Sequence, residues 1–286
     1  MNRLFILFQY IIPHHVLSRM TGWLAQAQSP RWLVDWVMTQ FVRVFDVDMS
    51  EAEEPDVTRY AHFNAFFTRC LKPDARPLAD ADVLCPADGV ISQMGSISNS
   101  LLLQAKGKYF ALEDLLGGDS ARAALFAGGE FATIYLSPRD YHRGHMPVTG
   151  TVAAATYVPG KLFYVNAVTA DNVDRLFSRN ERLVCHFDTE HGPMAMVRVG
   201  AMIDAGIETV WSGPVAPPPR IPSTLDYQQL PASVTLDKGA EMGRFYLGST
   251  VLLLFPRGVA AWKARYGAGM PTRMGEGLAD FLPSSA

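Results

Sequence analysis

Short apolar runs separated by turn residues dominate the chain from residue 83 onward. The runs occupy residues 131–136, 194–199, 207–211 and 251–255. Each is apolar or alternates with polar residues, which is the pattern of buried β-strands. Only brief helices are expected between them, at residues 112–116 and 173–177. Because long helices do not alternate with the strands, the pattern disfavours a parallel α/β sheet and predicts a largely antiparallel β-rich domain.

The first 47 residues have a helical pattern instead. Residues 4–12 are nearly all apolar, but a bilayer-spanning helix needs about 20 residues. We do not interpret this stretch as a signal peptide, because residues 13–15 interrupt it and the apolar pattern continues beyond. The whole chain is therefore predicted to be an α+β protein, with a helical region at 1–47, a connecting segment at 48–82 and a β-rich domain at 83–286.

Residues 31–47 form the most informative part of the helical region. Arg31, Asp35, Thr39 and Arg43 recur at intervals of four and would make a narrow polar stripe on a helix. The rest of the surface is apolar and includes tryptophans. So wide an apolar face fits either a deeply packed helix or one lying in a membrane interface, and the pattern alone does not choose between them. In the connecting segment, one short helix is expected around residues 62–71.

The net charge and the spacing of cysteines and histidines argue against several functional classes. The formal net charge of −3 does not suggest a nucleic-acid partner. The three cysteines, Cys70, Cys85 and Cys185, have no metal-binding or redox spacing. His142 and His145 form an H-x-x-H pair, but too few further ligands lie nearby to predict a metal site.

A Gly-Ser step at the start of the last apolar run is the first chemical feature. The carbonyl of Gly248 can be approached closely because glycine has no side chain, and the hydroxyl of Ser249 could attack it with the help of a base. Upstream, Asp88 and His145 supply the acid and the imidazole that such an attack requires. Taken singly, each is more often an ordinary turn, loop or strand-edge residue.

The combination of segments resembles a known family. The matching residues are 86–90, 104–107, 141–143 with 145–147, 180–182 and 247–250. On these residues the chain resembles the bacterial, pyruvoyl-dependent phosphatidylserine decarboxylases, over a span from the first residues to about Met274. Ala65 departs from the family pattern, where an acidic residue is expected, and the tail after Gly275 is short.

The resemblance implies a reaction sequence. Cleavage between Gly248 and Ser249 would convert Ser249 into a pyruvoyl group, with His145 as the base and Asp88 orienting it. The pyruvoyl group would then decarboxylate phosphatidylserine to phosphatidylethanolamine through a Schiff base. His142 would return a proton to the substrate carbon, a task suited to a group that titrates near neutral pH. No diffusible cofactor would be needed.

Further expectations concern substrate and partners. Lys106, Arg139 and Arg143 are candidates to hold the anionic head group. The resemblance also implies a peripheral location on the cytoplasmic face of the cell membrane, with residues 1–47 as the membrane-associating region. The large and small chains of one precursor would stay together, in a homodimer of processed protomers.

Three alternatives remain open on sequence grounds. A hydrolase could use Asp88, His145 and Ser249 as a triad, although no G-x-S-x-G motif surrounds Ser249. A non-enzymatic membrane-associated protein would leave the three residues unexplained. A pyruvoyl decarboxylase of a soluble amino acid would have no use for the apolar N-terminus.

We predict that the chain cleaves itself before Ser249. Intact mass spectrometry of purified, active protein should show a fragment of residues 1–248 and a fragment of residues 249–286 with a pyruvoyl N-terminus. A single full-length species with an ordinary serine at 249 would contradict the prediction and favour the hydrolase.

Overall fold

A nine-stranded sheet forms the centre of the molecule. The structure, a computed structural model, describes residues 6–7, 9–10, 14–105, 107–201, 206–215, 220–246 and 249–283. The strand order is β12-β7-β8-β9-β15-β5-β2-β17, with β13 paired to β7. These strands are β2 (Gly89–Ser96), β5 (Glu130–Leu136), β7 (Gly150–Val158), β8 (Arg182–Thr189), β9 (Gly192–Gly200), β12 (Ser223–Asp226), β13 (Thr235–Leu236), β15 (Ser249–Phe255) and β17 (Pro271–Thr272). Each of these pairings is antiparallel, which confirms the expected α+β class.

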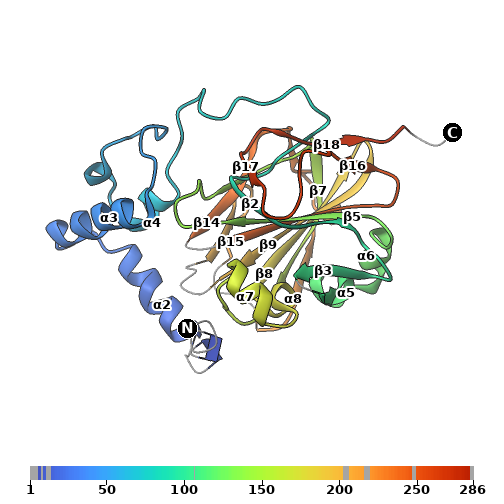
Figure 1. Ribbon diagram of the computed structural model, residues 1–286, viewed down its shortest axis with the longest axis horizontal. Helices are drawn as coiled ribbons and strands as arrows, with labels where there is room; N and C mark the ends of the chain where they lie inside the picture. The colour runs from blue at the N-terminus through green and yellow to red at the C-terminus, as the bar shows by residue number, and fades with distance from the viewer. Residues whose placement is uncertain are drawn as a thin grey trace.

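Two layers cover the faces of this sheet (Figure 1). One layer holds small sheets made of β1 (Val83–Leu84), β18 (Gly277–Phe281) and β16 (Ala260–Trp262), and of β11 (Gly213–Pro214), β10 (Gly206–Thr209), β14 (Glu241–Tyr246) and β6 (Arg143–His145). The other holds the hairpin of β3 (Leu101–Ala105) and β4 (Lys108–Ala111) with α5 (Leu112–Leu115), α6 (Ser120–Leu125), α7 (Ala167–Asn172) and α8 (Leu176–Arg179). The sheet is thus buried on both sides.

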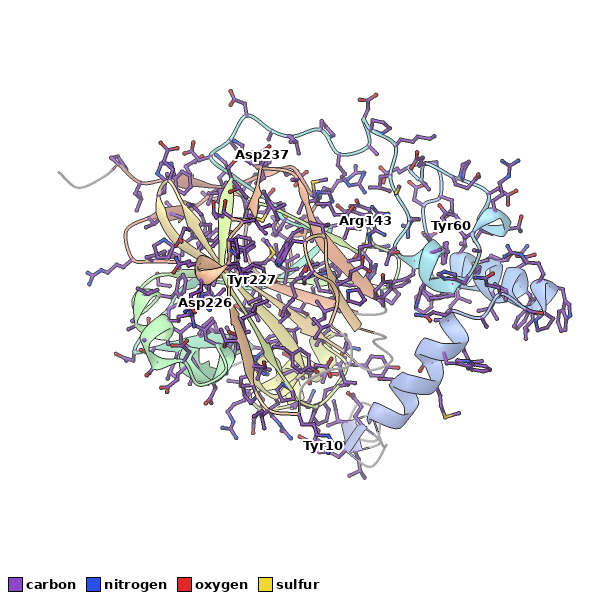
Figure 2. The ribbon with its side chains drawn as sticks, turned by 180° about the vertical axis from the view of Figure 1, so that it is seen from behind. Tyr10, Tyr60, Arg143, Asp226, Tyr227 and Asp237 are labelled. Atoms are coloured by element: carbon purple, nitrogen blue, oxygen red, sulfur yellow. The ribbon has the colours of Figure 1, made fainter. Side chains whose placement is uncertain are left out.

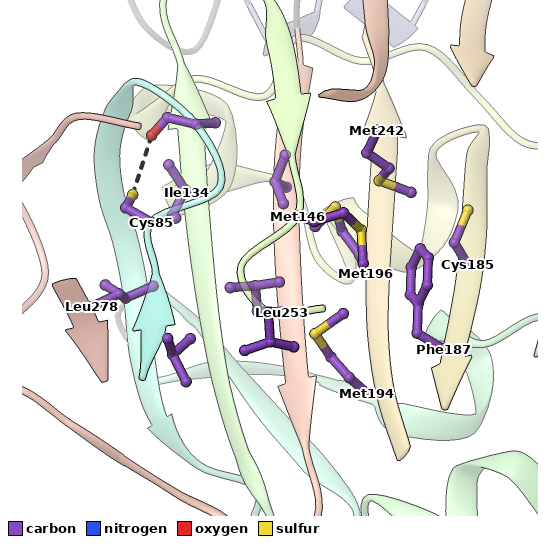
Figure 3. Close-up of a cluster of buried hydrophobic side chains, with 14 of the residues drawn as sticks. Cys85, Ile134, Met146, Cys185, Phe187, Met194, Met196, Met242, Leu253 and Leu278 are labelled. Carbon is purple, nitrogen blue, oxygen red and sulfur yellow. Dashed lines mark hydrogen bonds between the residues drawn. The ribbon is translucent and has the colours of Figure 1, made fainter. Parts of the chain in front are cut away.

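The apolar run of β15 is uninterrupted because the strand contributes to both cores. Val251 and Leu253 belong to the core on the side of the small sheets, together with Met196 and Phe187 (Figure 3). Leu252 belongs to the core on the helical side. Successive side chains of a strand point to opposite faces, so a strand buried on both faces has no polar alternation.

The expected strands at 131–136, 194–199 and 251–255 are confirmed as β5, β9 and β15. The expected strand at 207–211 is shorter, since β10 ends at Thr209 and a turn follows. The expected helix at 112–116 corresponds to α5, and the one at 62–71 to the shorter α4 (Phe63–Phe67).

The expected helix at residues 173–177 is wrong, because these residues contain the break between α7 and α8. Gln104, buried in β3, donates from Nε2 to the carbonyls of Ala170 and Val173. Its Oε1 accepts the backbone N–H of Leu176. One side chain therefore satisfies the end of one helix and the start of the next, which local sequence does not reveal.

The N-terminal region forms a separate helical unit. It contains α2 (His14–Ala25), α3 (Arg31–Phe45), the 3₁₀ turn η1 (Val57–Arg59) and α4. Its small core lies between α3 and α4 and includes Met38, Phe66 and Phe67. At the start of α3, Arg31 donates to the carbonyls of Tyr60 and Ala61, which ties the helix to the segment around η1.

The helical unit leaves much of its apolar surface uncovered. Only Val34 and Met38 of α3 are buried. The exposed fraction is 74% for Trp23, 71% for Trp32 and 58% for Trp36. Of the two possibilities raised by the sequence, the deeply packed helix is therefore wrong. In the described part of the chain, no helix is both long and apolar enough to cross a membrane.

Candidate active site

Ser249 stands at the first position of the central strand β15. Its backbone is aligned with Leu136 at the end of β5 and with Gly200 at the end of β9. Gly248 and the side chain of Ser249 lie outside the described structure. The ends of these strands point toward the N-terminal helices (Figure 1).

The histidine segment flanks the candidate cleavage site from two directions. Residues 137–142 leave β5 beside Ser249 and lead into β6, which pairs with β14. At the same point the backbone N–H of Phe245 donates to the carbonyl of His142 at 3.1 Å. His142 is therefore anchored close to the end of β14, and residues 137–141 connect it to the end of β5 that is aligned with Ser249.

His142 is buried, and within the described structure one of its ring nitrogens has no hydrogen-bond partner. Its Nδ1 lies 2.9 Å from the carbonyl oxygen of Asp140, so Nδ1 carries the proton and Nε2 is an acceptor. Among the described residues, Nε2 is buried without a hydrogen-bond partner. The centroid of its ring lies 3.9 Å from the centroid of the Phe67 ring in α4. Burial lowers the pKa of His142 from 6.5 to about 3, which keeps the imidazole neutral.

His145 lies in a different environment. Its Nδ1 donates to the carbonyl of Gly239 at 2.9 Å, and its Nε2 lies 3.1 Å from the hydroxyl of Tyr141. Burial also lowers the pKa of His145, against the opposing effect of the Gly239 hydrogen bond. His145 is aligned with Glu241, four residues before Phe245 on β14. Only three residues of chain connect the two histidines, so the backbone of His145 lies at most about 11 Å from that of His142, in the direction of the start of β14.

Asp88 reaches the same region but pairs with an arginine. The backbone N–H of His145 donates to the carbonyl of Pro86, which brings the two segments together. The carboxylate of Asp88, however, accepts from Arg76 Nε at 2.9 Å and from the backbone N–H of Met274 at 2.8 Å. Arg76 also bonds Glu51 at 2.8 Å. The expected direct contact between Asp88 and His145 is therefore absent from the described structure. Arg76 binds the carboxylate of Asp88, and both ring nitrogens of His145 have other partners.

The head-group candidates fall into three situations. Arg139 is exposed on the loop between β5 and β6. Arg143 is buried, and its guanidinium makes four hydrogen bonds, to the carbonyl of Thr68, to Cys70 and to Glu241. Figure 2 shows Arg143 at the junction between the sheets and the helical unit that carries Tyr60. Arg143 therefore joins two parts of the fold rather than offering free donors to a substrate. Lys106 lies outside the described residues.

Sequence reasoning missed Tyr141, Arg76 and Glu51. Tyr141 stands inside a segment already singled out, and an aromatic hydroxyl next to two histidines was an available signal. Arg76 and Glu51 belong to the connecting segment, which showed no chemical pattern. Within the described residues, no group of three or more His, Cys, Asp or Glu side chains is placed to hold a metal ion.

The buried His142 should make folding sensitive to acid. Between pH 6.5 and about 3 the unfolded chain binds a proton at His142 that the folded chain does not, so the free energy of unfolding falls as pH falls. In a Ser249→Ala background, where the predicted cleavage cannot occur, we expect His142→Gln to reduce the drop in the free energy of unfolding between pH 7 and pH 5 by about 2 kcal/mol. Urea unfolding at both pH values measures this, and an unchanged pH dependence would refute the burial argument.

The comparisons with known proteins agree on one family. The family model described as phosphatidylserine decarboxylase matches residues 63–280, and a second model, described as PSD, matches residues 4–46. A phosphatidylserine decarboxylase proenzyme of Pseudomonas putida (strain W619) is 56% identical, covering 97% of this chain and 98% of the relative. Another, of Pseudomonas aeruginosa (strain UCBPP-PA14), is 55% identical, covering 100% and 99%. The chain belongs to the phosphatidylserine decarboxylase family.

Proposed function

We propose that this chain is the proenzyme of a phosphatidylserine decarboxylase that cleaves itself between Gly248 and Ser249. The family membership supplies the reaction, since its members are named for it. The observation that carries the assignment of the site is the buried Nε2 of His142, which has no partner among the described residues and lies close to the end of β14.

The site fits a pyruvoyl group formed from Ser249. A residue at the start of a strand that is hydrogen-bonded on both sides is held in a fixed place, as a covalent cofactor requires. When present, this group supplies an electron sink for the loss of carbon dioxide. Nothing else about the reaction needs a bound cofactor, and the remaining tasks fall to side chains.

His142 and His145 have separate roles in this proposal. His145, with Asp88 nearby, acts in self-cleavage, where it removes the proton from the Ser249 hydroxyl. His142 acts on the substrate. Burial replaces the near-neutral titration expected from the sequence, so the imidazole is neutral at rest, and its Nε2 would hold the proton from the substrate ammonium only until it passes to the carbon that has lost carbon dioxide. The Nε2 of His142, which has no partner among the described residues, supports its role toward the substrate. The role of His145 rests on the family resemblance and requires its Nε2 to exchange the Tyr141 hydroxyl for that of Ser249.

The two chains stay together after cleavage, by this proposal. The small chain, residues 249–286, contains β15, whose backbone pairs with β5 and β9. It also contains β17 and β18, which pair with β2 and β1 of the large chain. The homodimer and the cytoplasmic face expected from the resemblance stay predictions.

The helical unit is proposed to seat the enzyme on the membrane surface without crossing it. Exposed Trp23, Trp32 and Trp36 are suited to the boundary between head groups and acyl chains. Because α4 of the same unit contacts His142 through Phe67, binding to the surface would bring the site close to a substrate that lies in the bilayer.

Single substitutions separate cleavage from decarboxylation. Ser249→Ala and His145→Ala should leave the chain uncut, and Asp88→Ala should slow cleavage, because a charge near the base is lost. His142→Ala should be cut normally, with decarboxylation reduced about 100-fold or more, the typical range for a proton-transfer residue. Gel analysis and release of carbon dioxide measure the two steps. If His142→Ala blocks cleavage while His145→Ala does not, the assigned roles are wrong.

Membrane binding should depend on the exposed tryptophans. Replacing Trp23, Trp32 and Trp36 together with serine should weaken binding to phospholipid vesicles at least about tenfold, because each ring buries apolar area in the interface. Binding of the parent chain should persist at high salt. Co-sedimentation measures both, with Ile221→Ser and Leu225→Ser, which alter exposed residues elsewhere, as the control. Equal binding by both variants would place the membrane contact outside the helical unit.

A further inference from the structure

Arg69 is a buried cation whose guanidinium makes few hydrogen bonds to the described residues. It follows α4 by two residues and is only 4% exposed. Among the described residues, its side chain makes one hydrogen bond, from Nη2 to the carbonyl of Arg139 at 3.2 Å, and it also lies over the ring of Phe66. Its Nε is buried with no partner among the described residues.

Two other buried arginines, Arg143 and Arg182, show what a structural role looks like. Arg143 makes four hydrogen bonds and joins α4 to β14. Arg182 also makes four, all to backbone carbonyls. Burying a charge without such bonds is costly, so a buried arginine with one weak bond points to a partner from outside the chain.

Nearby carboxylates do not serve as that partner. Asp88 is paired with Arg76 and with the backbone N–H of Met274. Asp140 accepts from the backbone and the hydroxyl of Ser137. Burial lowers the pKa of Arg69, whereas that of Arg76 is raised despite burial by its bonds to Asp88 and Glu51. The contrast indicates that the charge of Arg69 is uncompensated.

The position of Arg69 connects it to the candidate active site. Phe67, two residues earlier, packs against the ring of His142. Arg139, which receives the hydrogen bond of Arg69, belongs to the loop that leaves β5 beside Ser249. The side chain of Arg139 is 60% exposed and marks the solvent side of this cluster.

We propose that Arg69 binds the phosphodiester of the lipid head group and so places the serine moiety at His142. This deepens the proposed function and rests on it. The serine head group has two anions, a carboxylate and a phosphodiester. The carboxylate loses its charge as carbon dioxide leaves, so an arginine bound to it would stabilise the ground state and oppose the reaction. The phosphodiester stays anionic throughout, and guanidinium matches its oxygens well.

Kinetics test the proposal. Arg69→Gln and Arg69→Lys are compared with Arg122→Gln, a control that removes an arginine paired with Asp119 on α6. Cleavage on a gel shows that each variant folds. With phosphatidylserine in detergent micelles, Arg69→Gln should raise KM about tenfold or more, as loss of a charged hydrogen bond implies, while kcat changes far less. Arg69→Lys should lie between. An unchanged KM, or a loss confined to kcat, would overturn the assignment.

Direct binding provides a readout that does not depend on turnover. Glycerophosphocholine carries a phosphodiester but neither a carboxylate nor a reactive amine. By ligand-observed NMR, it should bind the processed enzyme and Arg122→Gln equally, and Arg69→Gln at least about tenfold more weakly. Tighter, Arg69-dependent binding of inorganic phosphate would instead assign the site to free phosphate. Arg69-dependent binding of N-acetylserine would assign it to the carboxylate. Either result overturns the proposal.

The outcomes separate this inference from the function on which it rests. If the parent chain did not decarboxylate phosphatidylserine, the proposed function would fail, while the binding of glycerophosphocholine would still test Arg69. If Arg69→Gln did not fold, Arg69→Lys would carry both comparisons, with a raised KM and weakened binding expected.

Discussion

The pairing of β15 with both β5 and β9 is the constraint on which the rest of the site depends. It holds Ser249 at the end of a buried strand and directs residues 137–142 from β5 past that end into β6. A strand bonded on both sides and buried on both faces has little freedom to shift. Cleavage at its first residue would therefore create a new N-terminus without releasing the strand, which makes this junction suitable for a cofactor formed from the chain itself.

Buried charge connects the helical unit to this frame. Arg76 joins Glu51 of the connecting segment to Asp88 at the start of β2, and Arg143 joins β6 to the end of α4. Charged groups removed from water need complete sets of partners, so these pairs define how the two parts fit together. At the contact between the helical unit and the sheets, Phe67 packs against the imidazole of His142. This contact connects the proposed membrane-binding unit to the candidate active site.

His142 and His145 are three residues apart in the chain but have different hydrogen-bond partners. Both donate from Nδ1 to a backbone carbonyl, which determines the tautomer and leaves Nε2 as the acceptor. Tyr141 occupies Nε2 of His145, while Nε2 of His142 has no partner among the described residues. The motif contains both histidines, but only their surroundings distinguish a nitrogen that is engaged from one that is available.

Local sequence alone was sufficient for the central strands and for the family. Strands such as β5 and β15 follow from apolar runs, because the pattern depends on neighbours in the chain, and the Gly248–Ser249 step is a short-range motif. Contacts between distant residues decided the rest. From about seventy residues away, Gln104 bonds the end of α7 and the start of α8, between which the predicted helix at 173–177 is interrupted. Arg76 binds the carboxylate of Asp88 that the triad pattern assigned to His145. A hydrogen bond across the fold depends on how segments pack, and burial, which sets the charge of His142, is a property of the assembled tertiary structure.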